Sequence, residues 1–207
     1  MQFSSPLARW NERFSSENYL FGEKPNQYLF DKTPLLKKGK ALAIADGEGR
    51  NSVWLASQGF SVDAFDFSPV AIAKAKKLAA KQHVNVNFYC NDWQSFNWIA
   101  DTYDTIAGVF FQFADPKQRT DLFEKLNLSL KPGGTLIIQG YGKEQISYQS
   151  GGPGILENLY DEELLVSSFM DYKILDIQTY LHEVNEGPGH SGLSALVGYI
   201  GQKPNQG

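Results

Sequence analysis

From residue 40 onward the chain alternates short apolar runs with longer segments of helical periodicity. The first run, Ala-Leu-Ala-Ile at residues 41–44, is too short for an independent helix and ends at a turn with two glycines. It therefore predicts a buried strand. Apolar runs or apolar–polar alternation predict further strands at residues 60–65, 84–89, 105–111, 135–139, 174–179 and 193–200.

Helix signals separate the first five strands. A short helix follows the first strand and ends before Gly59, which has the usual position of a glycine just past a helix end. Ser68 is expected as an N-cap, with Pro69 in the first turn, where its missing N–H is not needed. Asp115 and Gln118 predict a capping box at the start of another helix.

The last two predicted strands have no helix between them. They follow a glycine-rich loop at residues 150–154 and a helix around residues 161–169, and they predict a hairpin with one antiparallel strand. Strands that alternate with helices are joined by right-handed crossovers and form a mostly parallel sheet with helices on both faces. The sequence therefore predicts an α/β fold with a Rossmann-like sheet.

Residues 1–38 differ in character from the rest of the chain because they are rich in aromatic side chains, namely Trp10, Phe14, Tyr19 and Phe21. We expect this segment to form a helix and loop that cap the active site at the mouth of the sheet. Residues 39–207 would form the Rossmann-like core. Together they predict one domain over residues 1–207.

The composition fits one ordinary globular domain: 207 residues, 42% hydrophobic and 20% charged. A net charge of −4 argues against binding to nucleic acid or to an anionic membrane surface. One cysteine, no export signal at the N-terminus and no apolar stretch of about 18 residues favour a cytoplasmic protein, expected as a monomer or homodimer.

Polar residues follow three successive predicted strands. Residues 46–51 (Asp-Gly-Glu-Gly-Arg-Asn) combine two glycines with a helix N-terminus, so that a ligand can approach the backbone closely. Asp66 follows Gly47 by the spacing of an acid that accepts hydrogen bonds from ribose hydroxyls. Asp92 and Trp93 follow the third strand, where they could meet an exocyclic amine. The trio predicts an adenosine pocket; the alternative is a tight turn with two capping acids.

The charges of the glycine turn indicate which adenosine cofactor is bound. Ser52 stands where a dinucleotide-binding turn usually has its third glycine. Asp46 and Glu48 would repel a pyrophosphate but attract a cationic ammonium and sulfonium. The turn therefore favours S-adenosylmethionine (SAM) over a nicotinamide cofactor.

Several segments together resemble class I SAM-dependent methyltransferases. Residues 41–56 resemble the first motif of that family, residues 62–69 followed by Ala75 the second, and residues 130–136 the turn before its fifth strand. The N-terminal segment is similar to the small-molecule branch related to tellurite-resistance and thiopurine methyltransferases. That similarity rests on residues 10–14 (Trp-Asn-Glu-Arg-Phe) with Tyr19, Gly22, Pro25 and Asn26.

The resemblance implies a seven-stranded sheet of order 3-2-1-4-5-7-6 with strand 7 antiparallel, and SAM as the cofactor. It assigns the methionine portion to the glycine turn, the ribose to Asp66 and the adenine to Asp92 and Trp93. Phe110 is expected at the end of the fourth strand. The full set of expected cofactor-binding residues is Asp46, Gly47, Glu48, Gly49, Asn51, Asp66, Phe67, Asp92, Trp93 and Phe110.

Two positions depart from the family pattern. Ala43 stands where the family commonly has an acid, and Ala45 where it has glycine. Without that acid the usual contact with the amino group of SAM is missing, and Asp46 or Glu48 would take it over. A chain that binds SAM without transferring a methyl group therefore stays open as an alternative.

Methyl transfer from a sulfonium is an in-line displacement, so the protein mainly aligns the reactants and excludes water. A protein base is not needed if the acceptor arrives as a thiolate, selenide or oxyanion. Candidate catalytic residues on the acceptor side are Tyr19, Arg13, Tyr141 and His190. For Tyr19 and Arg13 the alternative is packing of the N-terminal helix on the sheet.

Other polar clusters have structural interpretations, and no metal is expected. Residues His182, Glu183, Glu186 and His190 lack the regular spacing of a metal site and are interpreted as a loop. Cys90 is interpreted as a packed thiol. The lysines of one predicted helix are expected on its solvated face; these are Lys74, Lys76, Lys77 and Lys81.

The sequence thus predicts methyl transfer from SAM to a small soft or anionic acceptor, such as a thiol or a selenite- or tellurite-like oxyanion. Two alternatives remain at this stage. One is a non-catalytic SAM-binding regulatory protein, and the other is a nicotinamide-dependent oxidoreductase.

Overall fold

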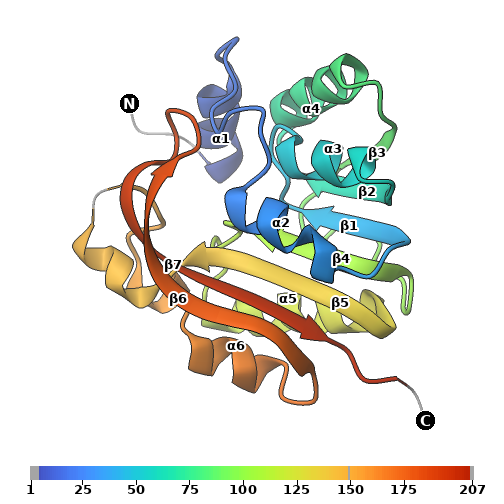
Figure 1. Cartoon of the computed structure of the whole chain (residues 1–207). Coiled ribbons are helices and arrows are strands. Elements are labelled where there is room, and N and C mark those ends of the chain that lie inside the picture. Colours follow the sequence, from blue (N-terminus) through green and yellow to red (C-terminus); the bar gives the residue numbers. More distant parts are fainter. Residues whose placement is uncertain (1–4, 149, 206–207) are drawn as a thin grey trace.

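The computed structural model describes residues 5–148 and 150–205 (Figure 1). Residues 1–4, which belong to the predicted cap and to the segment judged for an export signal, lie outside the described residues. The strands are β1 (Lys40–Ile44), β2 (Ser61–Asp66), β3 (Val86–Cys90), β4 (Tyr103–Val109), β5 (Leu130–Tyr141), β6 (Lys173–Asn185) and β7 (Ser191–Gln202).

The seven strands form one sheet of order β3-β2-β1-β4-β5-β7-β6. The first five strands pair in parallel, and β7 runs antiparallel to both β5 and β6. This confirms the predicted fold class and strand order. The carboxyl ends of β1, β2, β3 and β4 consequently meet at one edge, where an open α/β sheet binds its ligands.

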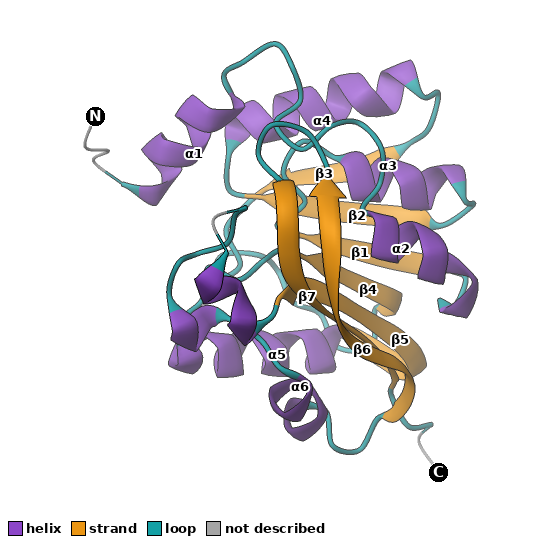
Figure 2. Cartoon of the chain, turned by 60° about the vertical axis from the view of Figure 1, so that its left-hand side comes forward, coloured by secondary structure: helices purple, strands orange, loops and turns teal. Residues whose placement is uncertain are grey.

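Helices lie on both faces of the sheet (Figure 2). The helices are α1 (Pro6–Phe14), α2 (Gln27–Lys32), α3 (Arg50–Ser57), α4 (Pro69–Lys81), α5 (Pro116–Ser129) and α6 (Glu162–Ser168), with 3₁₀ turns at Thr33–Leu35, Lys143–Ser147 and Leu156–Asn158. The predicted caps are present: the Ser68 side chain accepts from the amide of Ala71, and Asp115 with Gln118 forms a capping box.

Neighbouring residues of the central strand serve the two layers alternately. Ala41 belongs to the apolar cluster beneath α2 and α3, whereas Leu42 belongs to the larger cluster beneath α5 and α6. Because side chains of a strand alternate between its faces, a fully apolar run is required where both faces are covered. The unbroken apolar sequence of β1 has this cause.

The C-terminal hairpin is longer than predicted. Strand β6 continues to Asn185 and β7 begins at Ser191, so that His182 and Glu183 lie within a strand rather than in a loop. The tip of the hairpin bends toward the N-terminal segment (Figure 1), and the Gly189 amide donates to the carbonyl of Leu20 at 2.8 Å. Two segments far apart in the sequence thereby meet above the sheet edge.

The solvated lysine face predicted for α4 is wrong at one position. Lys74 is buried and forms an ion pair with Glu48, and its ammonium also donates to the carbonyls of Ser16 and Asn18 at 2.8 Å. Lys76 and Lys77 are exposed as expected. The difference arises because the N-terminal segment packs on this side of α4.

Among residues 5–148 and 150–205, no helix is both long and apolar enough to span a lipid bilayer.

Candidate functional site

The glycine turn joins β1 to α3 in a conformation that requires small residues. Ala45, Gly47 and Gly49 all have positive φ, of 46°, 59° and 89°. A Cβ added at Gly49 would lie 2.7 Å from the Cβ of Ala75 on α4, which explains why glycine is needed there. Ala45 adopts the left-handed region that favours glycine, at the position where the family pattern has glycine.

Two buried carboxylates flank this turn. Asp66, at the end of β2, accepts hydrogen bonds from the amides of Gly47 and Ser68, both at 2.9 Å. Asp46 accepts from the amide and hydroxyl of Ser52. Burial raises the pKa of Asp46 to about 7 and the pKa of Asp66 to about 6.

Neither carboxylate forms an ion pair with a lysine, arginine or histidine among the described residues. Buried acids without a cationic partner favour a positively charged ligand and disfavour a pyrophosphate. The acids present therefore fit the ammonium and sulfonium groups of SAM.

Glu48 differs from these two acids. Its carboxylate is buried against the ammonium of Lys74 and accepts a hydrogen bond from the amide of Leu20 at 2.7 Å. The side chain is thus directed to α4 and the N-terminal segment and already has a cationic partner. The expectation that Glu48 takes over the amino-group contact finds no free carboxylate in this arrangement.

The predicted adenine side lies at the end of β3. Asp92 is exposed, and one of its oxygens accepts from the amides of Gln94 and Ser95 at 3.0 and 2.7 Å. These bonds hold the pKa of Asp92 below its usual range. Trp93 is half-buried, and its carbonyl accepts from the indole of Trp98 at 2.7 Å. Phe67, half-buried after β2, lies between the ribose and adenine positions in the chain.

On the other side of the turn, three rings form a buried cluster at the ends of β4, β5 and the hairpin. The ring centroid of Phe110 lies 4.3 Å from that of His190 and 4.7 Å from that of Tyr141. Both Tyr141 and His190 are more than nine-tenths buried. The Tyr141 hydroxyl and His190 Nδ1 have no hydrogen-bond partner among the described residues. Buried polar atoms without partners indicate a place where a ligand binds.

Burial sets the charge states of these two groups. It lowers the pKa of His190, so that the imidazole is neutral near pH 7, and it raises the pKa of the Tyr141 phenol. The cluster therefore offers a neutral imidazole and a neutral hydroxyl to a ligand.

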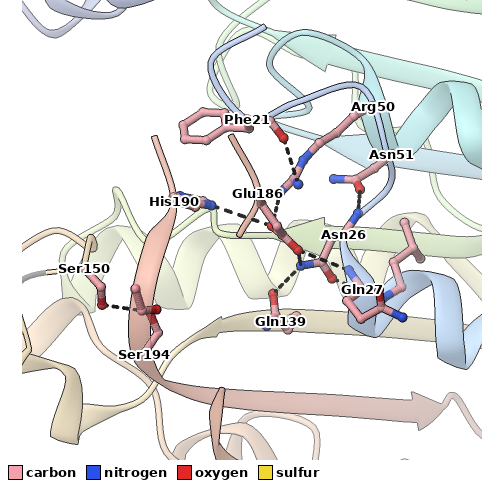
Figure 3. Close-up of polar contacts among 12 residues, drawn as sticks. Phe21, Asn26, Gln27, Arg50, Asn51, Gln139, Ser150, Glu186, His190 and Ser194 are labelled. Carbon is pink, nitrogen blue, oxygen red and sulfur yellow. Dashed lines mark hydrogen bonds and ion pairs between the residues drawn. The ribbon is translucent and has the colours of Figure 1, made fainter. Parts of the chain in front are cut away.

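A polar network joins the hairpin tip to the N-terminal segment (Figure 3). Glu186 forms an ion pair with Arg50 at 2.7 Å and accepts from the side-chain amide of Asn26 at 3.0 Å and the backbone amide of Gln27 at 3.2 Å. The Asn26 side chain also donates to Gln139 of β5 at 3.1 Å. These bonds hold the pKa of Glu186 near 2, mainly against the opposing effect of burial.

The sequence analysis assigned no role to Arg50 or Gln139 and considered Glu186 only as a possible metal ligand. Asn26 was singled out as part of the N-terminal motif, and Asn51 as part of the first motif. The structure brings these two together, because the Asn51 side chain accepts from the amide of Asn26 at 3.0 Å. An Arg after the glycine turn is the one local signal that pointed to this network.

Tyr19 and Arg13 take different positions in the N-terminal segment. The hydroxyl of Tyr19 donates to the carbonyl of Lys74 at 3.1 Å, and its ring packs beside α3 and α4. The guanidinium of Arg13 lies over the ring of Trp10, 4.5 Å from its centroid. Arg13 thus faces the aromatic side of the site, whereas Tyr19 is engaged with α4.

A cleft of about 120 Å³ opens between α2 and β6 and reaches Phe110, Gln139 and Glu186 at its inner end. It offers a route from the surface to the ring cluster. Within the described part of the chain, no group of three or more His, Cys, Asp or Glu side chains is arranged to hold a metal ion.

The strand order, the glycine turn and the acids at the ends of β1, β2 and β3 define a Rossmann-like nucleoside-binding protein of the methyltransferase type. Residues 41–134 match the family model described as a methyltransferase domain. A probable SAM-dependent methyltransferase, TehB of Haemophilus influenzae, is 22% identical over 160 residues, which cover 76% of this chain and 54% of that relative.

Solved structures show the same fold. The crystal structure of TehB from Haemophilus influenzae has a TM-score of 0.70 and 18% identity, covering 94% of this chain and 65% of that one. A structure from work on the conversion of a disulfide bond into a thioacetal group during echinomycin biosynthesis has a TM-score of 0.75 and 17% identity, covering 95% and 89%.

These comparisons confirm the predicted resemblance to class I methyltransferases, the class of enzymes that uses SAM as cofactor. The chain spans about half the length of the curated TehB relative that it matches. Acceptor and partners are therefore matters for proposal, as are the roles of individual site residues.

Proposed function

We propose that this protein transfers a methyl group from SAM to a small soft or anionic acceptor. The observation that carries the proposal is the pair of buried carboxylates, Asp46 and Asp66, at a glycine turn inside the segment that matches a methyltransferase domain. Their raised pKa values and lack of a cationic partner favour a nucleoside that bears positive charge.

The residues proposed to hold SAM extend along the strand ends. Gly47 and Gly49 leave room for the methionine portion, Asp66 accepts from the ribose hydroxyls, and Asp92 with Trp93 faces the adenine. Asp46 is the proposed partner of the amino group, since Glu48 is paired with Lys74. When bound, SAM supplies an electrophilic methyl group whose C–S bond breaks as the acceptor atom bonds to the methyl carbon.

The protein's own contribution is alignment and exclusion of water. Tyr141 and His190 present unpartnered polar atoms that would orient the acceptor against Phe110. Arg13 adds positive charge on this side of the site, and it favours an acceptor that is anionic or becomes so. Residues 5–38 and the hairpin tip cover the site and would keep water from the reacting atoms.

The names of two similar proteins agree with a soft acceptor. One is TehB, a probable SAM-dependent methyltransferase. The other was solved in work on conversion of a disulfide bond into a thioacetal group, which is sulfur chemistry. On this basis we propose thiols and selenite- or tellurite-like oxyanions as the first acceptors to test.

Thermal unfolding with S-adenosylhomocysteine (SAH) tests the cofactor assignment. At 100 times its dissociation constant, a ligand stabilises the fold by about 2.7 kcal/mol. We expect SAH to raise the melting temperature of the wild type and NAD to leave it unchanged. Asp66→Asn should abolish the SAH shift, whereas Asp121→Asn, an exposed acid on α5, should retain it. A full shift in Asp66→Asn would contradict the ribose assignment.

Turnover with methyl-labelled SAM then tests the acceptor side. We expect label on at least one member of a panel of thiols, selenite, tellurite and small amines. Tyr141→Phe and His190→Gln should each lower this turnover by about tenfold or more while the SAH shift persists. Equal loss of SAH binding in these variants would show that the two residues act in folding or cofactor binding.

A non-catalytic SAM-binding protein is the second candidate, and one observation favours it. The acid that the family commonly has at position 43 is replaced by alanine, and the neighbouring Glu48 is already paired with Lys74. Stabilisation by SAH with no transfer to any acceptor of the panel would select this function.

A further inference from the structure

Three aromatic rings of the N-terminal segment form a cluster beside the glycine turn. Trp10 and Phe14 of α1 stack with ring centroids 5.3 Å apart, and Phe21 lies 6.2 Å from Trp10 and 6.3 Å from Phe14. We refer to Trp10, Phe14 and Phe21 as the aromatic cage. Trp10 and Phe21 remain half-buried, whereas Phe14 is buried.

A cation already occupies this cage. The guanidinium carbon of Arg13 lies 4.5 Å from the centroid of Trp10 and 5.9 Å from that of Phe21. Arg13 forms no ion pair or hydrogen bond with a carboxylate among residues 5–148 and 150–205, so the rings are the main stabilising partners of its charge. Aromatic faces attract cations through the negative potential of the ring.

The cage lies between the two halves of the proposed site. On one side, a Cβ added at Gly47 would lie 3.6 Å from Cζ of Phe14, so this ring stands directly over the glycine turn. On the other side, the ring of Phe21 lies 4.3 Å from that of His190, which belongs to the buried cluster with Tyr141. A methyl donor that joins these halves has its sulfur between them.

We propose that the aromatic cage recognises the positive charge of the sulfonium and that Arg13 holds its place until SAM binds. This inference rests on the proposed function and goes beyond it, because it assigns discrimination between the charged methyl donor and its neutral product. The Arg13 side chain is long and half-buried, so it can turn toward solvent when the sulfonium takes its position.

The cage favours the donor over the product for a physical reason. SAM and SAH share the adenosine and the amino acid, and they differ at the sulfur, which carries a positive charge only in SAM. A cation–π contact is worth from about twofold to about 30-fold in binding, depending on how far the cation is desolvated. A ring that contributes this contact strengthens SAM binding and leaves SAH binding nearly unchanged.

Dissociation constants of three ligands test the proposal by calorimetry, without any acceptor. The ligands are SAM, SAH and sinefungin, in which a protonated amine takes the place of the methyl sulfonium. Trp10→Leu should weaken SAM and sinefungin by about 3- to 30-fold and change SAH by less than twofold. Phe30→Leu, an exposed aromatic residue of α2 stacked on Trp54, serves as the matched control and should change none of the three.

Arg13→Gln provides an independent arm, because it removes the competing cation while leaving the rings in place. SAM and sinefungin should bind about two- to fivefold more tightly to this variant, with SAH unchanged. Weaker binding of SAM to Arg13→Gln would overturn the placeholder role and assign Arg13 a direct contact with the ligand.

SAH binding also reports whether Trp10→Leu folds, and Trp10→Phe supplies a variant that keeps a ring and should retain most of the selectivity. Equal weakening of all three ligands, or no weakening of any, in Trp10→Leu would overturn the cage. If the wild type binds none of the three, the proposed function fails and the cage fails with it. Wild-type binding with unaltered selectivity in Trp10→Leu overturns the cage alone.

Discussion

At the scale of single residues, Asp46 and Asp66 give the unliganded protein an unusual dependence on pH. Burial raises their pKa values to about 7 and about 6, above the value near 3.8 of an unfolded chain. A raised folded-state pKa gives stability that is present below the unfolded pKa and lost as pH rises through the folded pKa. These two acids should therefore lower the free energy of unfolding between pH 4 and pH 7.

Asp46→Asn isolates this effect from acids with lowered pKa values, such as Glu186, which act in the opposite direction. In urea denaturation we expect the stability of Asp46→Asn relative to wild type to increase from pH 5 to pH 7.5. A constant difference over that interval would contradict the raised pKa of Asp46.

The acids could be located from sequence because the signals that place them are local. The spacing between the glycine turn and Asp66 follows from one strand–helix–strand unit, and both ends of that unit carry their own caps. Glu186 and Arg50 are separated by 136 residues in the chain, and their pairing depends on how the hairpin bends. No local pattern encodes such a contact, so the network around Glu186 could not be predicted.

At the scale of elements, α4 and the N-terminal segment are held together by one buried ion pair. Lys74 and Glu48 are both buried, so removing one partner leaves an uncompensated charge, which costs about 3–5 kcal/mol. We expect Lys74→Met to lower the free energy of unfolding by about 3 kcal/mol in urea denaturation. Lys77→Met, an exposed lysine on the same helix, should change it by less than about 0.5 kcal/mol.

The double variant Lys74→Met/Glu48→Leu tests the cause of that loss. It removes both charges, so much of the lost stability should return. If the two single losses simply add, the ion pair is not the reason for the burial of Lys74.

Helix periodicity gave the wrong side for Lys74 for a related reason. The four lysines of α4 follow a spacing typical of a solvated face, and the helix itself formed where its caps predicted. Whether one turn of that face is covered depends on residues 14–20, which reach α4 only in the folded chain. Sequence therefore predicts an element and its caps better than the segments that pack on it.

At the scale of the whole molecule, Glu186 is the point where the C-terminal hairpin, the N-terminal segment and α3 are joined. Its carboxylate binds Arg50, Asn26 and the amide of Gln27, so a single side chain couples three segments that cover the site. Glu186→Gln removes the charge that Arg50 is paired with and should loosen this cover without opening the sheet. Amide hydrogen exchange should accelerate by about tenfold or more in residues 20–27 and 186–190, with no change in β1 and β4.

Glu183→Gln is the matched control, because this acid lies exposed on the same strand and should leave the exchange rates unaltered. Because the cover and the proposed SAM site share Arg50 and the glycine turn, ligand binding and closure are expected to be linked. Added SAH should slow exchange of residues 20–27 in the wild type and less so in Glu186→Gln. Equal protection by SAH in both proteins would mean that the three segments close over the ligand independently of Glu186, and that the network serves stability alone.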